Sequence, residues 1–401
     1  MPPRLLDGDS TVMTRTSLGI ILLTGFVLRV SLLVVNLEFA TLPQGGGDAR
    51  GFEREAWEAA EFGREDVADY LLTGSGTVVL LGSYVYEITG RAPYVLGLLM
   101  VALGLGLIYL AHQVALEFWG DRRSARMVAW GAALFPQLAL HSALFLRELP
   151  VAFCLAAAAL YAIRYVKRND VGQFVWFSCW IAVGTLFHSG VIFAIPALLL
   201  GSLIARPRGS RGKFKFYAVN IAASLVLAGV IYTANETGFG LSKFGGSLDE
   251  AMETFETREQ RSTLGGAAFP EWMRVRGGLS DTWKVPIRYV ALLFSPLVPF
   301  MVKSPGHLLG VIDAALYLFL FSTLYRNWAT IKKNRPVVVL LVVMLALFFV
   351  YALGVSNFGT AIRHRAKMAP LLLILAAGLP ELVRRRKHRG AVARANRLIP
   401  A

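Results

Sequence analysis

The sequence predicts an all-α protein that crosses a membrane many times, and three observations carry this prediction. Of the 401 residues, 55% are hydrophobic and only 17% are charged. The mean hydropathy is +0.54. Apolar runs of membrane-spanning length recur along the chain. Soluble domains carry about 25% charged residues, so a chain this apolar could not cover its folded surface with polar side chains. A soluble enzyme, a disordered chain and a fibrous repeat are therefore excluded.

Ten apolar runs have about the 20 residues that a helix needs to cross the hydrocarbon core. They lie at residues 17–36, 92–116, 127–145, 148–166, 171–188, 189–205, 214–234, 306–325, 336–354 and 366–383. A further apolar stretch at 286–302 contains Pro286, Arg288, Pro296 and Pro299. We expect a broken or re-entrant segment there, because irregular backbone at membrane depth survives only against protein or water.

The distribution of basic residues predicts the orientation. Six segments hold 24 of the 41 Lys and Arg residues and only four acidic residues: 1–16, 118–126, 164–170, 206–215, 326–335 and 384–401. Basic loops stay in the cytosol. Ten spans then alternate across the plasma (inner) membrane with both termini cytoplasmic. The net charge of +15 therefore reports orientation, and no nucleic-acid partner is expected.

The same topology predicts a single integral membrane domain over residues 1–401. Its two long outer loops are 37–91 and 236–305, and its basic cytosolic tail is 384–401.

The first outer loop holds three glycines followed by Asp48, at the start of an amphipathic helical pattern. Glycine lets the backbone turn freely and approach a ligand closely. Asp48 is a good residue for a helix N-cap. It is also placed to act as a carboxylate base, or as a metal or sugar ligand, at the mouth of the membrane. The two roles are compatible.

Arg147 and Glu148 lie between two apolar spans, and His188 lies at the next outer turn. Charges near lipid depth are costly and point to function. Arg147 suits phosphate oxygens because its guanidinium is a planar fork. An internal salt bridge or a helix cap by Glu148 is the structural alternative. His188 is either a satisfied polar residue or a group that binds phosphate or moves a proton.

A basic run before the last span lies on the outer side, where positive charge is not usual. It contains Arg363, His364 and Arg365, and Lys303 adds to the same face. Ordinary contacts with lipid headgroups are one explanation. Phosphate or pyrophosphate is the more natural partner for such a cluster.

These candidates are far apart in sequence, yet the topology places them at one membrane face. The predicted catalytic residues are Asp48 and Glu148, and the predicted phosphate or lipid-carrier ligands are Arg147, His188, Lys303, Arg363, His364 and Arg365. A lipid-linked phosphate or pyrophosphate fits this set. The cations would stabilise the departing phosphate, and a carboxylate would take a proton from an acceptor hydroxyl. A divalent metal, Mg²⁺ or Mn²⁺, would use Asp48, although no dedicated cage is visible.

Residues 17–205 resemble the C-type (GT-C) membrane glycosyltransferases, close to the family 39 protein mannosyltransferase and lipid A aminoarabinose transferase group. The matching stretches are 25–29, 47–52, 82–91, 134–136 and 146–148. The resemblance maps the family's catalytic aspartate onto Asp48. The second acid and the Tyr that usually follow are absent. It implies a GT-C-like fold with juxtamembrane helices and a polyprenyl-phosphate or -pyrophosphate sugar donor. It also implies a glycan, lipid or protein acceptor outside the cytosol, in cell-envelope glycan synthesis.

Two other functions remain open. Residues 147–148, 186–189 and 363–365 are similar to Wzy/EpsG-type polymerases, which join undecaprenyl-pyrophosphate repeat units of polysaccharides. A non-enzymatic transporter or lipid flippase would instead show broken or charged helices near the bilayer midplane and inverted repeats. No clear repeat is present, and most candidate charges lie at one face.

Overall fold

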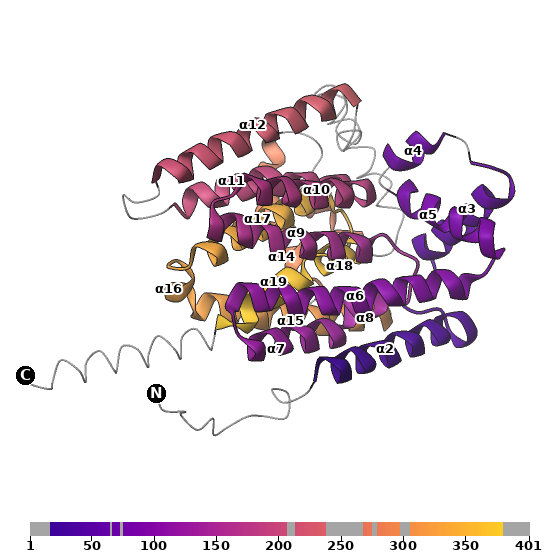
Figure 1. Ribbon diagram of the computed structural model, residues 1–401. Coiled ribbons are helices and arrows are strands. Elements are labelled where there is room, and N and C mark those ends of the chain that lie inside the picture. Colours follow the sequence, from indigo (N-terminus) through magenta and orange to yellow (C-terminus); the bar gives the residue numbers. More distant parts are fainter. Residues whose placement is uncertain are drawn as a thin grey trace, which may run out of the picture.

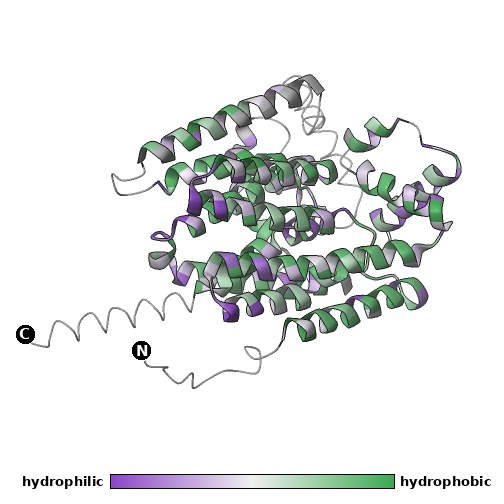
Figure 2. Ribbon diagram, in the orientation of Figure 1, coloured by the Kyte–Doolittle hydropathy of each residue, from purple (hydrophilic) through white to green (hydrophobic). Residues whose placement is uncertain are grey.

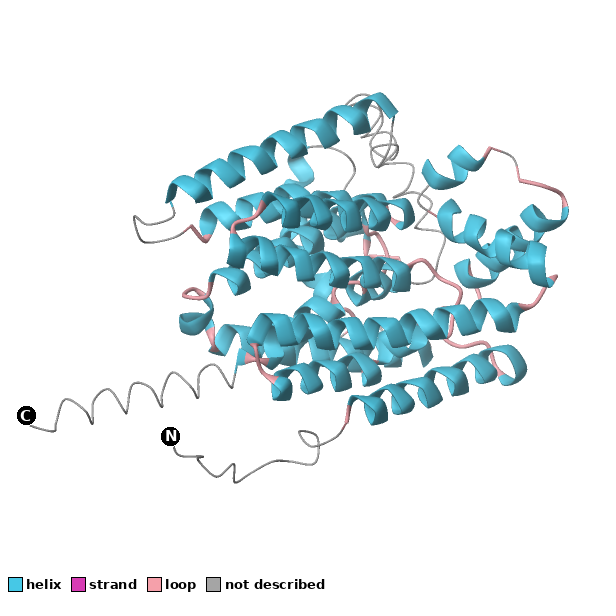
Figure 3. Ribbon diagram, viewed as in Figure 1, coloured by secondary structure: helices cyan, strands magenta, loops and turns pink. Residues whose placement is uncertain are grey.

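The computed structural model describes residues 17–64, 66–72, 75–206, 213–237, 268–274, 279–296 and 305–379. Within these ranges the chain is a bundle of helices joined by short loops (Figures 1 and 3). Within the same ranges, Ala268 and Asn357 form an isolated antiparallel β-bridge. The predicted all-α membrane fold is confirmed. Lys303, the tail at 384–401 and much of the loop at 236–305 lie outside the described residues.

The helices, in chain order, are α2 (Leu18–Val34), η1 (Val35–Phe39), α3 (Asp48–Glu61), α4 (Val67–Leu72), α5 (Gly76–Thr89), α6 (Pro93–Trp119), α7 (Arg122–Leu134), α8 (Pro136–His141), α9 (Glu148–Arg168), α10 (Val171–Phe187), η2 (Ser189–Phe193), α11 (Ala194–Ile204), α12 (Lys213–Thr237), η3 (Glu271–Met273), η4 (Leu279–Lys284), α14 (Val285–Phe294), α15 (Pro305–Arg326), α16 (Trp328–Ile331), α17 (Arg335–Gly354), α18 (Phe358–Ala366) and α19 (Ala369–Ala377).

Five helical segments of the described chain are long and apolar enough to cross a membrane by themselves. They are Leu18–Phe39, Pro93–Trp119, Glu148–Arg168, His307–Arg326 and Arg335–Gly354. The other predicted spans coincide with α10, α11, α12 and α19 and with the successive helices α7 and α8. Hydrophobic residues dominate the bundled helices (Figure 2). Hydrophilic residues concentrate in α3 and at the end of the bundle that lies away from α3.

Two turns at the predicted cytosolic end use the same chemistry. Gly120 ends α6 with φ +64°, and Asn169 ends α9 with φ +48°, both in the left-handed conformation that stops a helix. The next residue then caps the following helix. Asp121 accepts hydrogen bonds from the first backbone N–H groups of α7, and Asp170 does the same for α10. Two residues are thus enough to reverse the chain.

The apolar run predicted as a span at 127–145 forms two helices and not one, because the helix breaks at Pro136. Proline lacks the N–H that would bond to the carbonyl four residues earlier. Helix α7 therefore ends at Leu134, and α8 starts afresh at Pro136. The buried Arg29 satisfies the carbonyls that lose their partners. Its Nη1 donates to Ala133 O and its Nη2 to Ala132 O, each at 3.0 Å.

The stretch predicted to be broken, 286–302, begins as the ten-residue helix α14. At 1.5 Å per residue such a helix is about 15 Å long, too short to cross a bilayer. Arg288 on α14 is buried and donates to the carbonyls of Ala352 and Leu353, at the end of α17. This contact attaches α14 to the bundle. Residues 297–304 lie outside the described part of the chain.

The predicted first outer loop folds into a small helical unit, α3 to α5, at one end of the bundle (Figure 1). The rings of Trp57 and Tyr86 meet edge to face, with centroids 6.0 Å apart, and so join α3 to α5. Gly47 is the N-cap residue of α3, and Asp48 is its first helical residue. The N-cap role considered for Asp48 is therefore wrong, and its carboxylate is available for other contacts.

Candidate active site at the α3 end of the bundle

Helix α18 presents the basic groups on which the site is built. Asn357 caps the helix by accepting a hydrogen bond from the Thr360 N–H at 2.7 Å. Residues four apart lie on one face of a helix. Arg363 and Lys367 therefore point the same way, with His364 beside them, whereas Arg365 points to a different side.

Arg363 joins two carboxylates that come from distant parts of the chain. Its Nε and Nη2 donate to Oε1 of Glu148 at 3.1 and 2.9 Å, and its Nη1 donates to Oδ2 of Asp48 at 2.5 Å. The Glu148 side chain is 1% exposed, and that of Asp48 is 53% exposed. The arginine thus connects a buried carboxylate to one that faces solvent. Although burial alone lowers the pKa of Arg363, the two carboxylates hold it above its ordinary value.

A second cation lies behind Arg363. The Lys367 ammonium is fully buried, 4.0 Å from Oε1 of Glu148. It also contacts Nδ1 of His364 at 2.8 Å. Burial, reinforced by the Lys367 charge, holds the pKa of His364 well below its ordinary value. A neutral His364 ring can accept a hydrogen bond from the ammonium at Nδ1.

Three rings pack together beside Lys367. The rings of Tyr351 and His364 stack with centroids 4.8 Å apart. His188 meets the same two rings edge-on, at centroid distances of 5.0 and 4.8 Å. This packing fixes the orientation of α18 against α17 and the end of α10.

Arg147 precedes α9, and its charge is not matched by a direct partner. Its Nε is buried and has no hydrogen-bond partner among the described residues. It lies within electrostatic range of Glu148, Arg363 and Asp48. Burial lowers the pKa of Arg147, but a guanidinium stays protonated at physiological pH. A partly buried guanidinium whose Nε has no hydrogen-bond partner among the described residues is suited to receive an anion.

The glycine loop before Asp48 is anchored to α8. Gln44 donates from Nε2 to Oε1 of Gln137 at 3.1 Å, and its Oε1 lies 3.0 Å from Nε2 of His141. Gln44 has a positive φ of +68°, so the chain turns sharply here before α3 begins. These contacts hold the loop, and with it Asp48, against the site.

The cluster has an excess of positive charge. Arg147, Arg363 and Lys367 carry three positive charges, and Asp48 and Glu148 carry two negative ones. The predicted site residues that the structure brings together are Asp48, Arg147, Glu148, His188, Arg363 and His364. Lys303 lies outside the described residues.

Arg365 does not fit the predicted role of phosphate ligand. Its side chain is fully buried, and its Nε donates to Oδ2 of Asp313 at 2.6 Å. Its remaining N–H groups donate to backbone carbonyls of Leu293, Ser295 and Gly310. The guanidinium is occupied by protein groups, so we assign Arg365 a structural role that joins α14, α15 and α18.

Sequence reasoning missed Lys367 and Tyr351 as members of the site. Lys367 could have been found, because it lies four residues after Arg363 and so shares its helix face. Tyr351 gives no comparable signal, because it stands within an apolar span where aromatic residues usually serve as packing.

The described residues do not fit a dedicated divalent metal site. They contain no group of three or more His, Cys, Asp or Glu side chains that could hold an ion. The Asp48 carboxylate, the predicted ligand, already contacts Arg363. A divalent metal at Asp48 stays a prediction.

The fold can be compared with known proteins once this geometry is described. No family model and no curated protein sequence matches the chain. Among solved structures it is similar to ArnT from Cupriavidus metallidurans, a crystal structure bound to undecaprenyl phosphate. The TM-score is 0.50 and the sequence identity 16%. The match covers 90% of this chain and 60% of the ArnT chain.

The chain has the GT-C fold. At this identity the similarity concerns the arrangement of the helices, and it agrees with the resemblance found in the sequence. The similarity to Wzy/EpsG-type polymerases stays a prediction.

Proposed function

We propose that the chain is a membrane glycosyltransferase. It moves a sugar from a polyprenyl-phosphate-linked donor to an acceptor at the outer face of the membrane, in cell-envelope glycan synthesis. The observation that carries the proposal is the contact of Arg363 with Asp48 and Glu148, next to the unpaired Arg147. The fold similarity to a protein solved with undecaprenyl phosphate supports the same class of carrier.

In this proposal the guanidinium groups of Arg147 and Arg363 bind the donor phosphate. The bond between the sugar C1 and the phosphate oxygen breaks, and negative charge builds up on the departing phosphate. Fixed cations in a poorly solvated site stabilise that charge. A new bond forms between C1 and the acceptor oxygen. The acceptor proton passes to the Asp48 carboxylate, which acts as the general base.

Asp48 and Glu148 have different tasks in this scheme. Asp48 is half exposed, so an acceptor hydroxyl can reach it. Glu148, predicted as a second catalytic carboxylate, is almost fully buried and holds Arg363 by two hydrogen bonds. We assign Glu148 a positioning role. When the donor phosphate draws one N–H of Arg363 away from Asp48, Glu148 keeps the arginine in place.

A polymerase of pyrophosphate-linked repeat units is the second candidate. The observation that favours it is the third cation, Lys367, behind Arg363. A pyrophosphate carries more charge than a phosphodiester, and three cations would match it better than two. The two candidates use the same residues and differ in donor and product. A transporter or lipid flippase would not require the solvent-facing carboxylate.

The test separates binding from transfer. Undecaprenyl phosphate serves as the binding probe for the purified protein, and glycan synthesis in producing cells reports transfer. Arg147→Ala removes a charge-assisted hydrogen bond worth about 1.5–3 kcal/mol, so binding weakens by about 10- to 100-fold. Asp48→Asn keeps binding and abolishes transfer. Normal glycan from correctly inserted Asp48→Asn protein would contradict the proposed function.

A further inference from the structure

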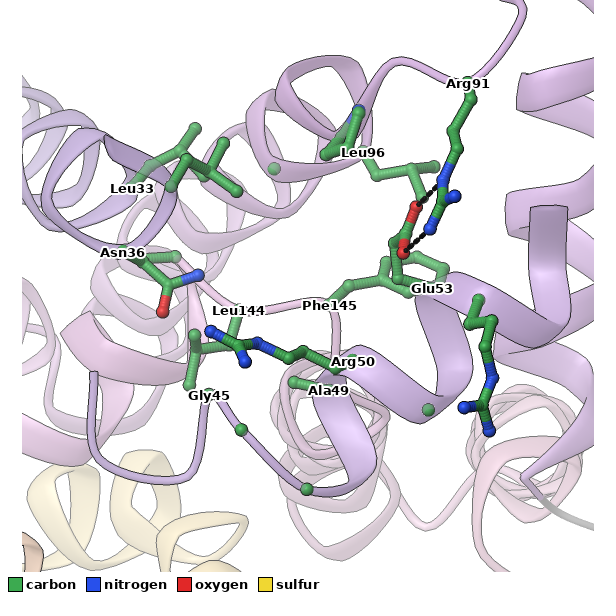
Figure 4. Close-up of a pocket in the computed structure, with 18 residues that line it drawn as sticks. Leu33, Asn36, Gly45, Ala49, Arg50, Glu53, Arg91, Leu96, Leu144 and Phe145 are labelled. Atoms are coloured by element: carbon green, nitrogen blue, oxygen red, sulfur yellow. Dashed lines mark hydrogen bonds and ion pairs between the residues drawn. The ribbon is translucent and has the colours of Figure 1, made fainter. Parts of the chain in front are cut away.

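A cavity lies beside α3, and the residues that line it are not those of the charged cluster. Its volume is about 610 Å³, and it opens between α3, the end of α2 and the start of α6 (Figure 4). Asp48 and Arg363 are not among its lining residues. This size lies within the ~300–1,000 Å³ range of small-molecule sites. The cavity could hold a headgroup and the first part of a lipid chain, but not a whole lipid.

One wall of the cavity is apolar and continuous with the membrane spans. Leu33 and Leu37 come from the end of the span Leu18–Phe39, and Pro93 and Leu96 come from the start of the span Pro93–Trp119. Both spans reach the end of the bundle occupied by α3 at this point (Figure 1). Because both candidate spans end beside the cavity, we infer that it lies near the depth where lipid headgroups meet acyl chains.

The opposite wall is cationic, although one of its arginines is neutralised. Arg91 makes a two-fold contact with Glu53, from Nε at 3.1 Å and from Nη2 at 3.0 Å (Figure 4). Tyr86 donates a further hydrogen bond to Glu53 at 2.8 Å. Burial raises the pKa of Glu53, but the hydrogen bonds from Arg91 and Tyr86 outweigh it and hold the pKa below its ordinary value. This pair is saturated and adds no net charge.

Of the other two arginines that line the cavity, Arg50 has no acidic partner among the described residues and Arg54 has an exposed one. Arg50 extends across the cavity (Figure 4), and it donates to the neutral hydroxyl of Thr41. Arg54 lies 3.6 Å from Glu58, and both side chains are more than half exposed. Such exposed pairs contribute little. Three arginines and one glutamate thus line the cavity, so the lining carries a net positive charge, which Glu58 partly offsets at Arg54.

Glycines leave the floor of the cavity open. A Cβ built on Gly47 or Gly51 meets no atom within 4 Å. Gly51 lies in α3 with ordinary helical geometry, so a larger side chain there would extend into the cavity without distorting the helix. This gives a way to fill the cavity that leaves every charge in place.

We propose that this cavity binds a second, phosphate-bearing amphiphile, with its phosphate at Arg50 and Arg54 and its chain along Leu33, Leu37 and Leu96. The inference does not depend on the transfer reaction. Two sources share this chemistry, a polyprenyl phosphate and an anionic membrane phospholipid. The apolar wall and the cationic wall are both required, so an uncharged or zwitterionic lipid is not a ligand.

The experiment measures lipid binding to the delipidated full-length protein by native mass spectrometry. The probes are undecaprenyl phosphate, phosphatidylglycerol and, as a zwitterionic control, phosphatidylcholine. The variants are Arg50→Ala/Arg54→Ala, which removes the charges, and Gly51→Leu, which fills the cavity. Arg122→Ala, an exposed arginine at the far end of the bundle, is the matched control. Each titration is repeated in the Arg147→Ala background, so that the charged cluster contributes less.

The expected result is that both cavity variants weaken binding of at least one phosphate lipid about tenfold or more, while Arg122→Ala changes nothing. Preference for undecaprenyl phosphate identifies the carrier as the source, and preference for phosphatidylglycerol identifies a membrane phospholipid. Unchanged binding in both cavity variants, or equal binding of phosphatidylcholine, would overturn the inference. Asp48→Asn must keep this binding. Its loss of transfer with intact lipid binding separates the cavity from the proposed reaction.

Discussion

Arg363 and Asp48 form one ion pair, but we predict that mutating them changes the stability of the protein to different extents. Glu148 is 1% exposed and accepts two hydrogen bonds from Arg363, whereas Asp48 is 53% exposed and accepts one. Removing one partner of a buried ion pair costs about 3–5 kcal/mol, because the remaining charge stays buried and unpaired. An exposed pair is worth about 0–1 kcal/mol. We therefore expect Arg363→Ala to destabilise the protein strongly and Asp48→Asn hardly at all.

The assay is thermal unfolding of the purified protein in detergent, followed by the fluorescence of its 8 tryptophans. At about 2 °C per kcal/mol, the lower end of the usual range, Arg363→Ala lowers Tm by about 6–10 °C and Asp48→Asn by at most about 2 °C. The double variant Glu148→Gln/Arg363→Ala does not recover the stability lost in Arg363→Ala, because it takes the carboxylate away from the buried Lys367. Glu61→Gln, an exposed carboxylate on the same helix as Asp48, is the matched control.

Transfer depends on Asp48 although stability does not. Asp48→Asn abolishes it while the protein stays folded, since a general base contributes about 10²–10⁴-fold. Equal Tm losses for Arg363→Ala and Asp48→Asn, or transfer retained in Asp48→Asn, would refute the reasoning about this bridge.

Three further predictions concern the buried groups. Asp313→Asn leaves Arg365 without its counterion and costs about 3–5 kcal/mol. The protein that folds nevertheless binds undecaprenyl phosphate as wild type does, and tighter binding would restore Arg365 as a phosphate ligand. Arg147→Lys keeps the charge but loses the planar guanidinium fork. Its affinity for undecaprenyl phosphate is therefore expected to lie between those of wild type and Arg147→Ala in the same titration. Wild-type affinity would exclude a contact of two guanidinium N–H groups with the phosphate. Because the pKa of His364 is well below its ordinary value in the folded protein, the unfolded chain takes up a proton near pH 6.5 that the folded one does not. The free energy of unfolding is therefore highest above that pH, and at lower pH it decreases by up to about 1.4 kcal/mol per pH unit. The slope of Tm against pH is smaller in His364→Gln than in wild type. An identical slope would contradict a neutral buried ring.

Much of the architecture could be predicted because membrane spans have a simple signature. Length and apolarity located the helices, and the paired turns at 120–121 and 169–170 carry ordinary capping residues. The break at Pro136 was missed because hydropathy alone does not register the lost backbone donor. Its compensation by Arg29, about a hundred residues earlier, is a tertiary contact that no local pattern encodes.

The candidate site shows the same limit in its basic residues. Arg363 and Arg365 are two positions apart on α18, so they point to different sides of the helix. One reaches the carboxylates of Asp48 and Glu148, and the other is enclosed by Asp313 and backbone carbonyls. Composition and topology predict that both arginines lie at the same membrane face. Only the packing of α14 and α15 decides which guanidinium remains available to a ligand.

The most direct test of the central claim is an experimental structure of the protein with undecaprenyl phosphate. Our account predicts the carrier phosphate at hydrogen-bond distance, about 3 Å, from the guanidinium of Arg147. Arg363 would then contact the phosphate and Glu148, and Asp48 would be released. A carrier phosphate found only elsewhere, with the contact between Arg363 and Asp48 intact, would contradict it.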